Sequence, residues 1–170
     1  VGIKAPQFSF SRLNKADPVL GVEMASTGEV GCIGEDYYEA VLIAMLSVGY
    51  NIPKSNILLS AGGARSTIEL LNSARMLRDK DFNLFSLPET HNFLEANGID
   101  STMLYPPGSS EKPNVMDFIK NRIVELVINI PKSLKRNELS NDYKIRRGAI
   151  DYNIPLITNS RLASAFIYAV

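Results

Sequence analysis

Short apolar runs alternate along this sequence with longer segments in which apolar residues recur every three to four positions. The runs have the length of β-strands, and the longer segments have helical periodicity. Strands that alternate with helices at this spacing form βαβ units, in which a mainly parallel sheet is covered on both faces. We therefore predict an α/β fold with a mainly parallel five-stranded sheet and helices on both faces. The predicted strands are residues 56–60, 82–86, 101–105, 124–130 and 154–158.

Composition excludes several classes of protein. The 170 residues suffice for one compact domain and a short appended segment. Lys+Arg and Asp+Glu both number 18, so the net charge gives no reason to expect binding to nucleic acid or to an anionic membrane. No apolar run approaches the ~20 residues that cross a bilayer. One cysteine, Cys32, and one histidine, His91, cannot make an internal disulfide or the usual four-ligand zinc site.

The first 30 residues differ from the rest, because their apolar positions show no sustained period of helix or strand. The chain also begins with Val1 and has no basic leader. We expect it to be a piece of a longer polypeptide. We also expect residues 1–30 to pack poorly on the remainder, with apolar side chains such as Phe8, Phe10 and Leu13 partly exposed.

A ligand site is expected at the carboxyl ends of the predicted strands, where open parallel sheets bind their ligands. Neither of the two strong nucleotide-binding glycine motifs occurs. Gly62 and Gly63, between a strand and a helix, could present backbone N–H groups to an anion, although a simple reversal of the chain explains them equally well. The candidate binding residues around these strand ends are Arg65, Thr90, Tyr105, Asn129, Lys132 and Thr158.

Asn129 carries the clearest signal, because it is a polar residue near the carboxyl end of the apolar strand 124–130. Leaving its amide buried and unpaired would cost roughly 1–3 kcal/mol, so it needs a loop backbone or a ligand. Arg146 and Arg147 are open to three interpretations: an anion clamp, a solvated helix face or a structural ion pair. We expect His91 to be a surface side chain without a catalytic task and Cys32 to be buried and inert. The residues thus predict no catalytic centre and no metal site.

Several stretches resemble the carboxyl-terminal end of the carbamoyl phosphate synthetase large subunit and the equivalent part of its fused eukaryotic forms. The most specific is DPVLGVEMASTGEV at residues 17–30, which resembles the signature that ends a synthetase unit of that family. The later stretches in the family's order are residues 39–53, 125–129, 143–147 and 153–156. The resemblance covers essentially the whole chain.

This resemblance implies two parts. Residues 1–34 resemble the tail of the preceding ATP-grasp synthetase unit, and residues 35–170 resemble the methylglyoxal synthase-like allosteric domain. The implied function is binding of a small anionic effector that modulates ATP-dependent carbamoyl phosphate synthesis, in pyrimidine or arginine biosynthesis, elsewhere in the parent chain. The parent would be a ligase that uses ATP and magnesium, whereas this fragment would be non-catalytic and without a cofactor.

Partners and location follow from the same resemblance. The implied partners are the synthetase domains, a glutaminase subunit or domain and the effector, with a second copy of the chain as a further option. The implied location is cytoplasmic, or mitochondrial for an ammonia-dependent eukaryotic form.

The resemblance leaves the effector open. Family members that bind pyrimidine nucleotides carry a T-x-x-T loop, of which Thr90 matches the second threonine while Leu87 replaces the first. Asn129 matches their asparagine, and prolines stand near the position of their lysine. Members activated by N-acetylglutamate share Thr90 and Asn129 and add an aromatic residue, for which Tyr105 is the candidate.

Two alternatives remain. A methylglyoxal synthase-like phospho-lyase would need an aspartate in the loop after the third strand, and residues 106–112 contain none. A passive oligomerisation domain would keep the fold without a ligand.

Overall fold

The computed structural model describes residues 1–19, 28–131 and 141–170. Its main sheet is parallel and five-stranded, in the order β5-β4-β3-β6-β7. The α/β prediction is therefore confirmed, and each of the five strands falls within or next to its predicted range. The strands are β3 (Asn56–Ala61), β4 (Asn83–Ser86), β5 (Thr102–Met103), β6 (Leu126–Ile130) and β7 (Leu156–Ile157).

Alternate side chains of the central strands enter two separate cores, because successive residues of a strand point to opposite faces. Ile57 and Leu59 of β3 belong to one core, and Leu58 between them belongs to the other. In β6, Val127 likewise faces the second core while its neighbours face the first. The apolar runs of the sequence are thus strands that are buried on both faces, as parallel sheets require.

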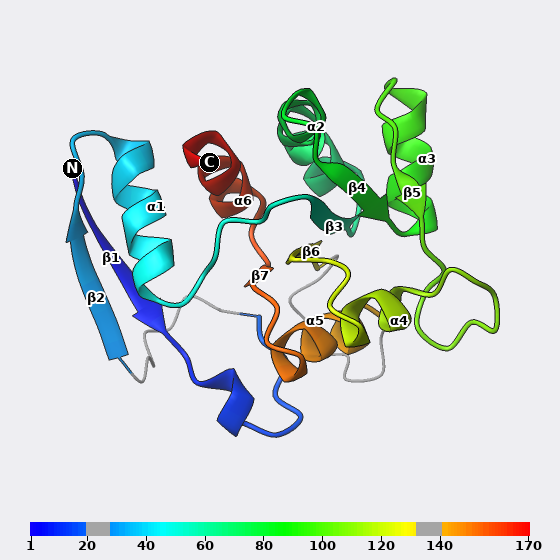
Figure 1. Ribbon diagram of the computed structural model, residues 1–170, viewed down its shortest axis with the longest axis horizontal. Helices are drawn as coiled ribbons and strands as arrows, with labels where there is room; N and C mark the ends of the chain where they lie inside the picture. The colour runs from blue at the N-terminus through cyan, green and yellow to red at the C-terminus, as the bar shows by residue number, and fades with distance from the viewer. Residues whose placement is uncertain (20–27, 132–140) are drawn as a thin grey trace.

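Helices cover both faces of the sheet, as predicted (Figure 1). Three of them, α2, α3 and α6, lie on one face, and α4 and α5 lie on the other. An eleven-residue helix, α1, lies between α6 and the amino-terminal strands (Figure 1). The bounds are α1 (Tyr37–Ser47), α2 (Ala64–Asp79), α3 (Pro88–Ala96), α4 (Val115–Lys120), α5 (Asn141–Asp151) and α6 (Ser160–Ala169). None of the helices in the described ranges is long and apolar enough to cross a membrane.

Polar side chains fix where helices begin. The Asp36 carboxylate accepts a hydrogen bond from the backbone N–H of Glu39 at 2.9 Å and so caps α1. Asn159 caps α6 in the same way, by accepting from Leu162 N at 3.0 Å. Such caps satisfy backbone donors that have no partner inside the helix.

The amino-terminal residues form regular structure that their sequence pattern did not predict. β1 (Gly2–Gln7) and β2 (Gly28–Ile33) pair antiparallel in a separate two-stranded sheet that packs on α1 (Figure 1). A short 3-10 helix, η1 (Phe10–Arg12), follows β1. Glycines in both strands and Pro6 weaken their β-propensity, and the two partners lie more than twenty residues apart, so the pairing left no local signal.

The structure agrees only in part with the expectation that residues 1–30 pack poorly on the remainder. Leu13 is 46% exposed, and Phe8 and Phe10 are half-buried. The backbone of the same segment is nevertheless held firmly by α5. Arg147 Nη1 lies within hydrogen-bond distance of the carbonyl oxygens of Phe10 at 3.1 Å, Leu13 at 3.0 Å and Ala16 at 3.3 Å.

Candidate functional site

The carboxyl end of β3 brings two of the predicted binding residues together. In the sheet register, Ser60 stands opposite Asn129 of β6. One residue later, the backbone N–H of Ala61 donates to Thr90 Oγ1 at 3.1 Å. Both Thr90 and Asn129 are buried, with exposed fractions of 4% and 0%. We call Gly62, Gly63, Thr90, Asn129 and Thr158, which surround the ends of β3, β6 and β7, the strand-end site.

The buried amide of Asn129 has a side-chain partner rather than the loop backbone or ligand that its burial suggested. Arg146 Nη1 donates to Asn129 Oδ1 at 2.9 Å. The same guanidinium donates from Nε to Asp17 Oδ1 at 2.7 Å and from Nη2 to Asp17 Oδ2 at 2.5 Å. Of the three interpretations of Arg146, the structural ion pair is therefore the one that the structure shows.

These contacts orient the strand-end groups as hydrogen-bond donors. A guanidinium can only donate, so Asn129 must turn its oxygen toward Arg146 and its NH₂ group away from it. The Nδ2 atom has a long contact of 3.5 Å with Asp142 Oδ1. The N–H of Ala61 uses an acceptor lone pair of Thr90 Oγ1, which leaves the hydroxyl hydrogen for donation to another group.

The amino-terminal turn of α2 adds backbone donors at the same place. Gly63, its first flanking residue, has φ of +87°, a conformation that favours glycine, and no side chain caps the helix. Gly62 N donates to Ile130 O at 2.8 Å and so joins this turn to the end of β6. Uncapped N–H groups and the helix dipole favour a negative charge at this end. Together the strand-end site offers donors that suit an acceptor-rich, anionic group.

Arg65 does not point into the strand-end site. Its side chain is 86% exposed, and its Nε pairs with Glu69 Oε1 at 3.2 Å. Glu69 also accepts a hydrogen bond from the Ser160 hydroxyl, and this bond and the Arg65 guanidinium hold the pKa of Glu69 below its ordinary value. The positive charge expected at the site from Arg65 is thus directed at Glu69.

The remaining predicted residues are placed differently. Thr158 follows β7 and is half-buried beside the end of β6. Tyr105 follows the edge strand β5, beyond β4, and its backbone is held by hydrogen bonds to Pro113 O and from Val115 N. Lys132 lies outside the described residues. Leu87, at the position of the missing threonine, packs against the core on the α4 and α5 face.

His91 is less exposed than its sequence position suggested. Its side chain is 14% exposed, and Nδ1 lies 2.9 Å from Ser101 Oγ. Ser101 in turn lies 2.8 Å from Ser86 Oγ, so packing of α3 against β4 and β5 covers the ring and supplies its partner. Cys32 is buried, as expected. Within the described ranges, no three His, Cys, Asp or Glu side chains are grouped closely enough to hold a metal ion.

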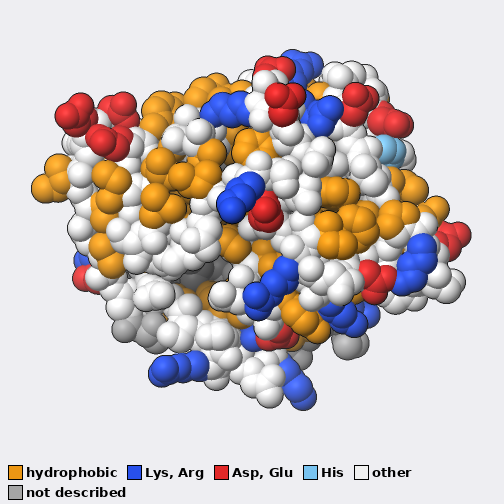
Figure 2. Space-filling model, in the orientation of Figure 1, with side chains coloured by type: hydrophobic (Ala, Val, Ile, Leu, Met, Phe, Trp, Pro, Cys, Tyr) orange, Lys and Arg blue, Asp and Glu red, His pale blue; other side chains and the backbone are white. Residues whose placement is uncertain are grey.

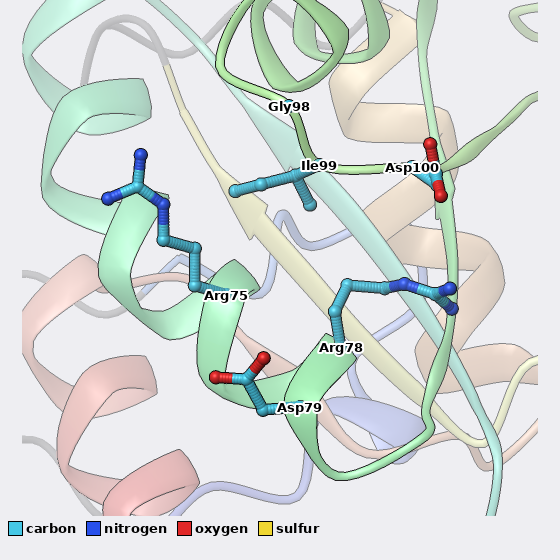
Figure 3. Close-up of a pocket in the computed structure, with 6 residues that line it drawn as sticks. All are labelled: Arg75, Arg78, Asp79, Gly98, Ile99 and Asp100. Atoms are coloured by element: carbon cyan, nitrogen blue, oxygen red, sulfur yellow. The ribbon is translucent and has the colours of Figure 1, made fainter.

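Two hollows have linings that include neither Thr90 nor Asn129. One, of about 390 Å³, lies between the end of α2 and the turn before β5, where charges of both signs meet (Figure 3). It is lined by Arg75, Arg78, Asp79, Gly98, Ile99 and Asp100. The other, of about 350 Å³, lies beside α1 and α6 and includes the exposed rings of Tyr37, Tyr38 and Tyr168.

The face shown in Figure 2 does not have the charge pattern of a surface that binds a polyanion. Basic and acidic side chains are interspersed over it, and hydrophobic side chains gather over the α1 and α6 side (Figure 2). A nucleic-acid interface would need a continuous basic stripe.

Comparison with known proteins identifies the family. Residues 69–158 match the family model described as the MGS-like domain. The multifunctional protein pyrABCN of Emericella nidulans is 46% identical over 179 residues, which span all of this chain and 8% of that protein. The multifunctional protein CAD of Squalus acanthias is 41% identical over 184 residues, again spanning all of this chain and 8% of that protein.

A third relative carries the synthetase in its name. The mitochondrial carbamoyl-phosphate synthase (ammonia) of Homo sapiens is 39% identical over 176 residues, which span all of this chain and 12% of that protein. The chain therefore spans only about a tenth of the length of these relatives. The resemblance to carbamoyl phosphate synthetase is confirmed, and because the family model covers more than half of the sequence, the chain belongs to the MGS-like domain family.

Proposed function

We propose that this chain is the allosteric regulatory domain of a carbamoyl phosphate synthetase and that it binds a small anionic effector at the strand-end site. The observation that carries this proposal is the common orientation of the strand-end groups. Asn129 turns its oxygen to Arg146 and directs one of its two Nδ2 hydrogens to Asp142, and Thr90 accepts from Ala61, so each retains one donor hydrogen. The uncapped start of α2 adds backbone donors beside them. Carboxylate and phosphate oxygens are the acceptors that such a set favours.

Two effector classes fit this site, pyrimidine nucleotides and N-acetylglutamate. Both supply acceptor oxygens for Thr90 and Asn129. Leu87 is apolar and packs into the core, which removes the second hydroxyl that a T-x-x-T loop would offer. Tyr105 is half-buried beyond β4 and could cover the apolar part of either ligand.

The proposal assigns catalysis to the longer parent chain. ATP and magnesium would act in its synthetase units, and the effector signal would pass to them. Residues 1–34 would belong to the preceding synthetase unit and residues 35–170 to the regulatory domain. The separate hydrogen-bonding of β1 and β2, which join no strand of the main sheet, supports this division. Synthetase domains and a glutaminase would be the partners, in the cytoplasm or, for an ammonia-dependent form, in mitochondria.

A thermal-shift screen followed by calorimetry tests the proposal. The probes are uridine triphosphate, inosine monophosphate, ornithine and N-acetylglutamate. A ligand at about 100 times its Kd adds about 2.7 kcal/mol of stability. Thr90→Ala and Asn129→Ala should each weaken the binding of that probe about 10- to 100-fold, because each removes a bond to a charged group.

Matched controls separate the site from general damage. Thr102→Ala and Asn92→Ala change exposed residues of the same types and should leave the Kd unchanged within about twofold. If every probe fails, a passive oligomerisation domain becomes the better account. Release of phosphate from dihydroxyacetone phosphate above a boiled control would instead favour a phospho-lyase.

A further inference from the structure

One buried guanidinium joins three distant parts of the chain. Arg146, on α5, is 4% exposed. It contacts Asn129, which is 17 residues earlier in the sequence, and Asp17, which is 129 residues earlier. Asp17 belongs to the segment that leads away from β1, and Asn129 belongs to the strand-end site.

The geometry of this contact couples its two ends. The Arg146 guanidinium is planar, and its Nε and Nη2 atoms face the two oxygens of Asp17 in a bidentate pair. That pair fixes the plane of the group and therefore the direction of the remaining Nη1, which donates to Asn129 Oδ1 at 2.9 Å. A shift of Asp17 thus turns Nη1, and a shift of Nη1 releases the oxygen of Asn129. Lysine could not hold both partners in this way, because its ammonium is a single point of charge.

The neighbouring Arg147 binds the backbone of the same amino-terminal segment but does not contact the strand-end site. Arg147 donates to the carbonyl oxygens of residues 10, 13 and 16 and pairs with Asp151. Among the described residues, the hydrogen-bond partners of Arg147 lie outside the strand-end site. Arg147 therefore contacts the segment alone, whereas Arg146 contacts both the segment and Asn129.

We propose that Arg146 is a positioning residue that sets the amide orientation of Asn129 and couples the strand-end site to the docking of residues 8–19 on α5. The ligand-binding half of this inference rests on the proposed function; the coupling between Asn129 and residues 8–19 does not. Linkage is reciprocal. If docking of residues 8–19 raises the affinity for a ligand at Asn129 by some factor, the bound ligand must raise the docking equilibrium by the same factor.

The first experiment needs no ligand. Hydrogen exchange is measured on the whole chain at the backbone amides of Arg12, Leu13 and Ala16, which donate to carbonyls within the docked segment. Asn129→Leu removes the partner of Arg146 Nη1 and should speed this exchange about fivefold or more. Thr90→Val removes a polar group from the same strand end without touching Arg146. It should change the exchange rate of these amides by less than about twofold. Equal effects of the two variants, or no effect of Asn129→Leu, would overturn the coupling.

The second experiment uses whichever of uridine triphosphate or N-acetylglutamate binds the wild type in calorimetry. Arg146→Gln should raise its Kd about tenfold or more, whereas Arg147→Gln should change it less than about threefold. Asp17→Asn, which leaves Arg146 in place and touches no residue of the site, should raise the Kd about threefold or more when the variants are compared at an equal folded fraction. Equal Kd values for wild type and Asp17→Asn would overturn the positioning role.

The two proposals fail in different ways. If neither probe binds the wild type, the effector proposal fails, and the exchange experiment alone decides the role of Arg146. If a probe binds but Asn129→Leu and Asp17→Asn leave exchange and Kd unchanged, the effector proposal stands and the coupling is wrong.

Discussion

Asp17 and Arg146 form the most buried ion pair in the described parts of the chain, with side chains 15% and 5% exposed. Removing one partner of such a pair leaves a charge without compensation in a desolvated place. Asp17→Ala should therefore lower the free energy of unfolding by about 3 kcal/mol, as measured by urea denaturation. Glu29→Ala, which breaks the exposed pair between Glu29 and Lys4, should cost less than about 1 kcal/mol. Equal costs would contradict the structural role of Asp17.

Glu125 makes part of the stability depend on pH. Its Oε2 atom accepts from the backbone N–H groups of Lys54 at 2.7 Å, Ser55 at 2.8 Å and Asn56 at 3.3 Å. Partial burial is the largest single influence and raises the pKa of Glu125, but the three N–H groups together outweigh it and hold the pKa below its ordinary value. A carboxyl group with a lowered pKa stabilises the fold above its unfolded-state pKa, and this contribution is lost as the pH falls through the folded-state value.

Glu125→Gln should remove that dependence. The difference in unfolding free energy between wild type and variant should be largest near neutral pH and should shrink below the unfolded-state pKa of about 4.3. Urea titrations at several pH values measure it, with Glu111→Gln as an exposed control. A difference that stays constant with pH would show that Glu125 acts through packing alone.

At the residue scale, the sequence predicted part of the site. Thr90 and Asn129 could be placed together because Thr90 follows one strand of a parallel sheet and Asn129 lies near the end of another, and carboxyl ends meet at one edge. Arg146 and Asp17 could not be joined, since 129 residues separate them and each alone resembles an ordinary surface charge. Arg65 does not reach the strand end because its guanidinium pairs with Glu69, four residues later on the same helix.

At the scale of elements, buried strands were predictable and exposed ones were not. The five strands of the main sheet are apolar runs, and their length and flanking turns distinguish them from helices. β1 and β2 are half-exposed and rich in glycine, and they are defined by pairing with each other across a long intervening segment. Local pattern therefore gave no indication of them.

The junction between β2 and α1 depends on a glycine. A Cβ on Gly34 would lie 2.5 Å from the backbone nitrogen of Ala40, well inside van der Waals contact. Gly34→Ala should destabilise the chain by about 1–3 kcal/mol, because backbone has to move to admit the methyl group. Gly31→Ala, where a Cβ would meet open space, should cost much less. Thermal unfolding of the two variants distinguishes them, and equal Tm values would mean that α1 and β2 separate easily.

At the scale of the whole molecule, the two-stranded sheet and the five-stranded sheet share no strand pairing, but the chain is held together in two places. α1 packs between β1–β2 and α6, and α5 grips the segment after β1 through Arg146 and Arg147 (Figure 1). The α5 contact through Arg146 reaches Asn129, so the strand-end site and the attachment of the amino-terminal part meet at one helix. Exposed apolar side chains over α1 and α6 include Tyr37, Tyr38 and Tyr168 (Figure 2).

The central claim is that an anionic ligand binds through the donors at the strand ends. The most direct measurement is a titration of the isotopically labelled chain with N-acetylglutamate and with uridine triphosphate, followed by nuclear magnetic resonance. One of the two should shift the amides of Ala61 to Gly63, the amide of Thr90 and the side-chain NH₂ of Asn129 most strongly. Shifts confined instead to the hollow lined by Arg75 and Ile99, or to the tyrosines of α1 and α6, would contradict the claim.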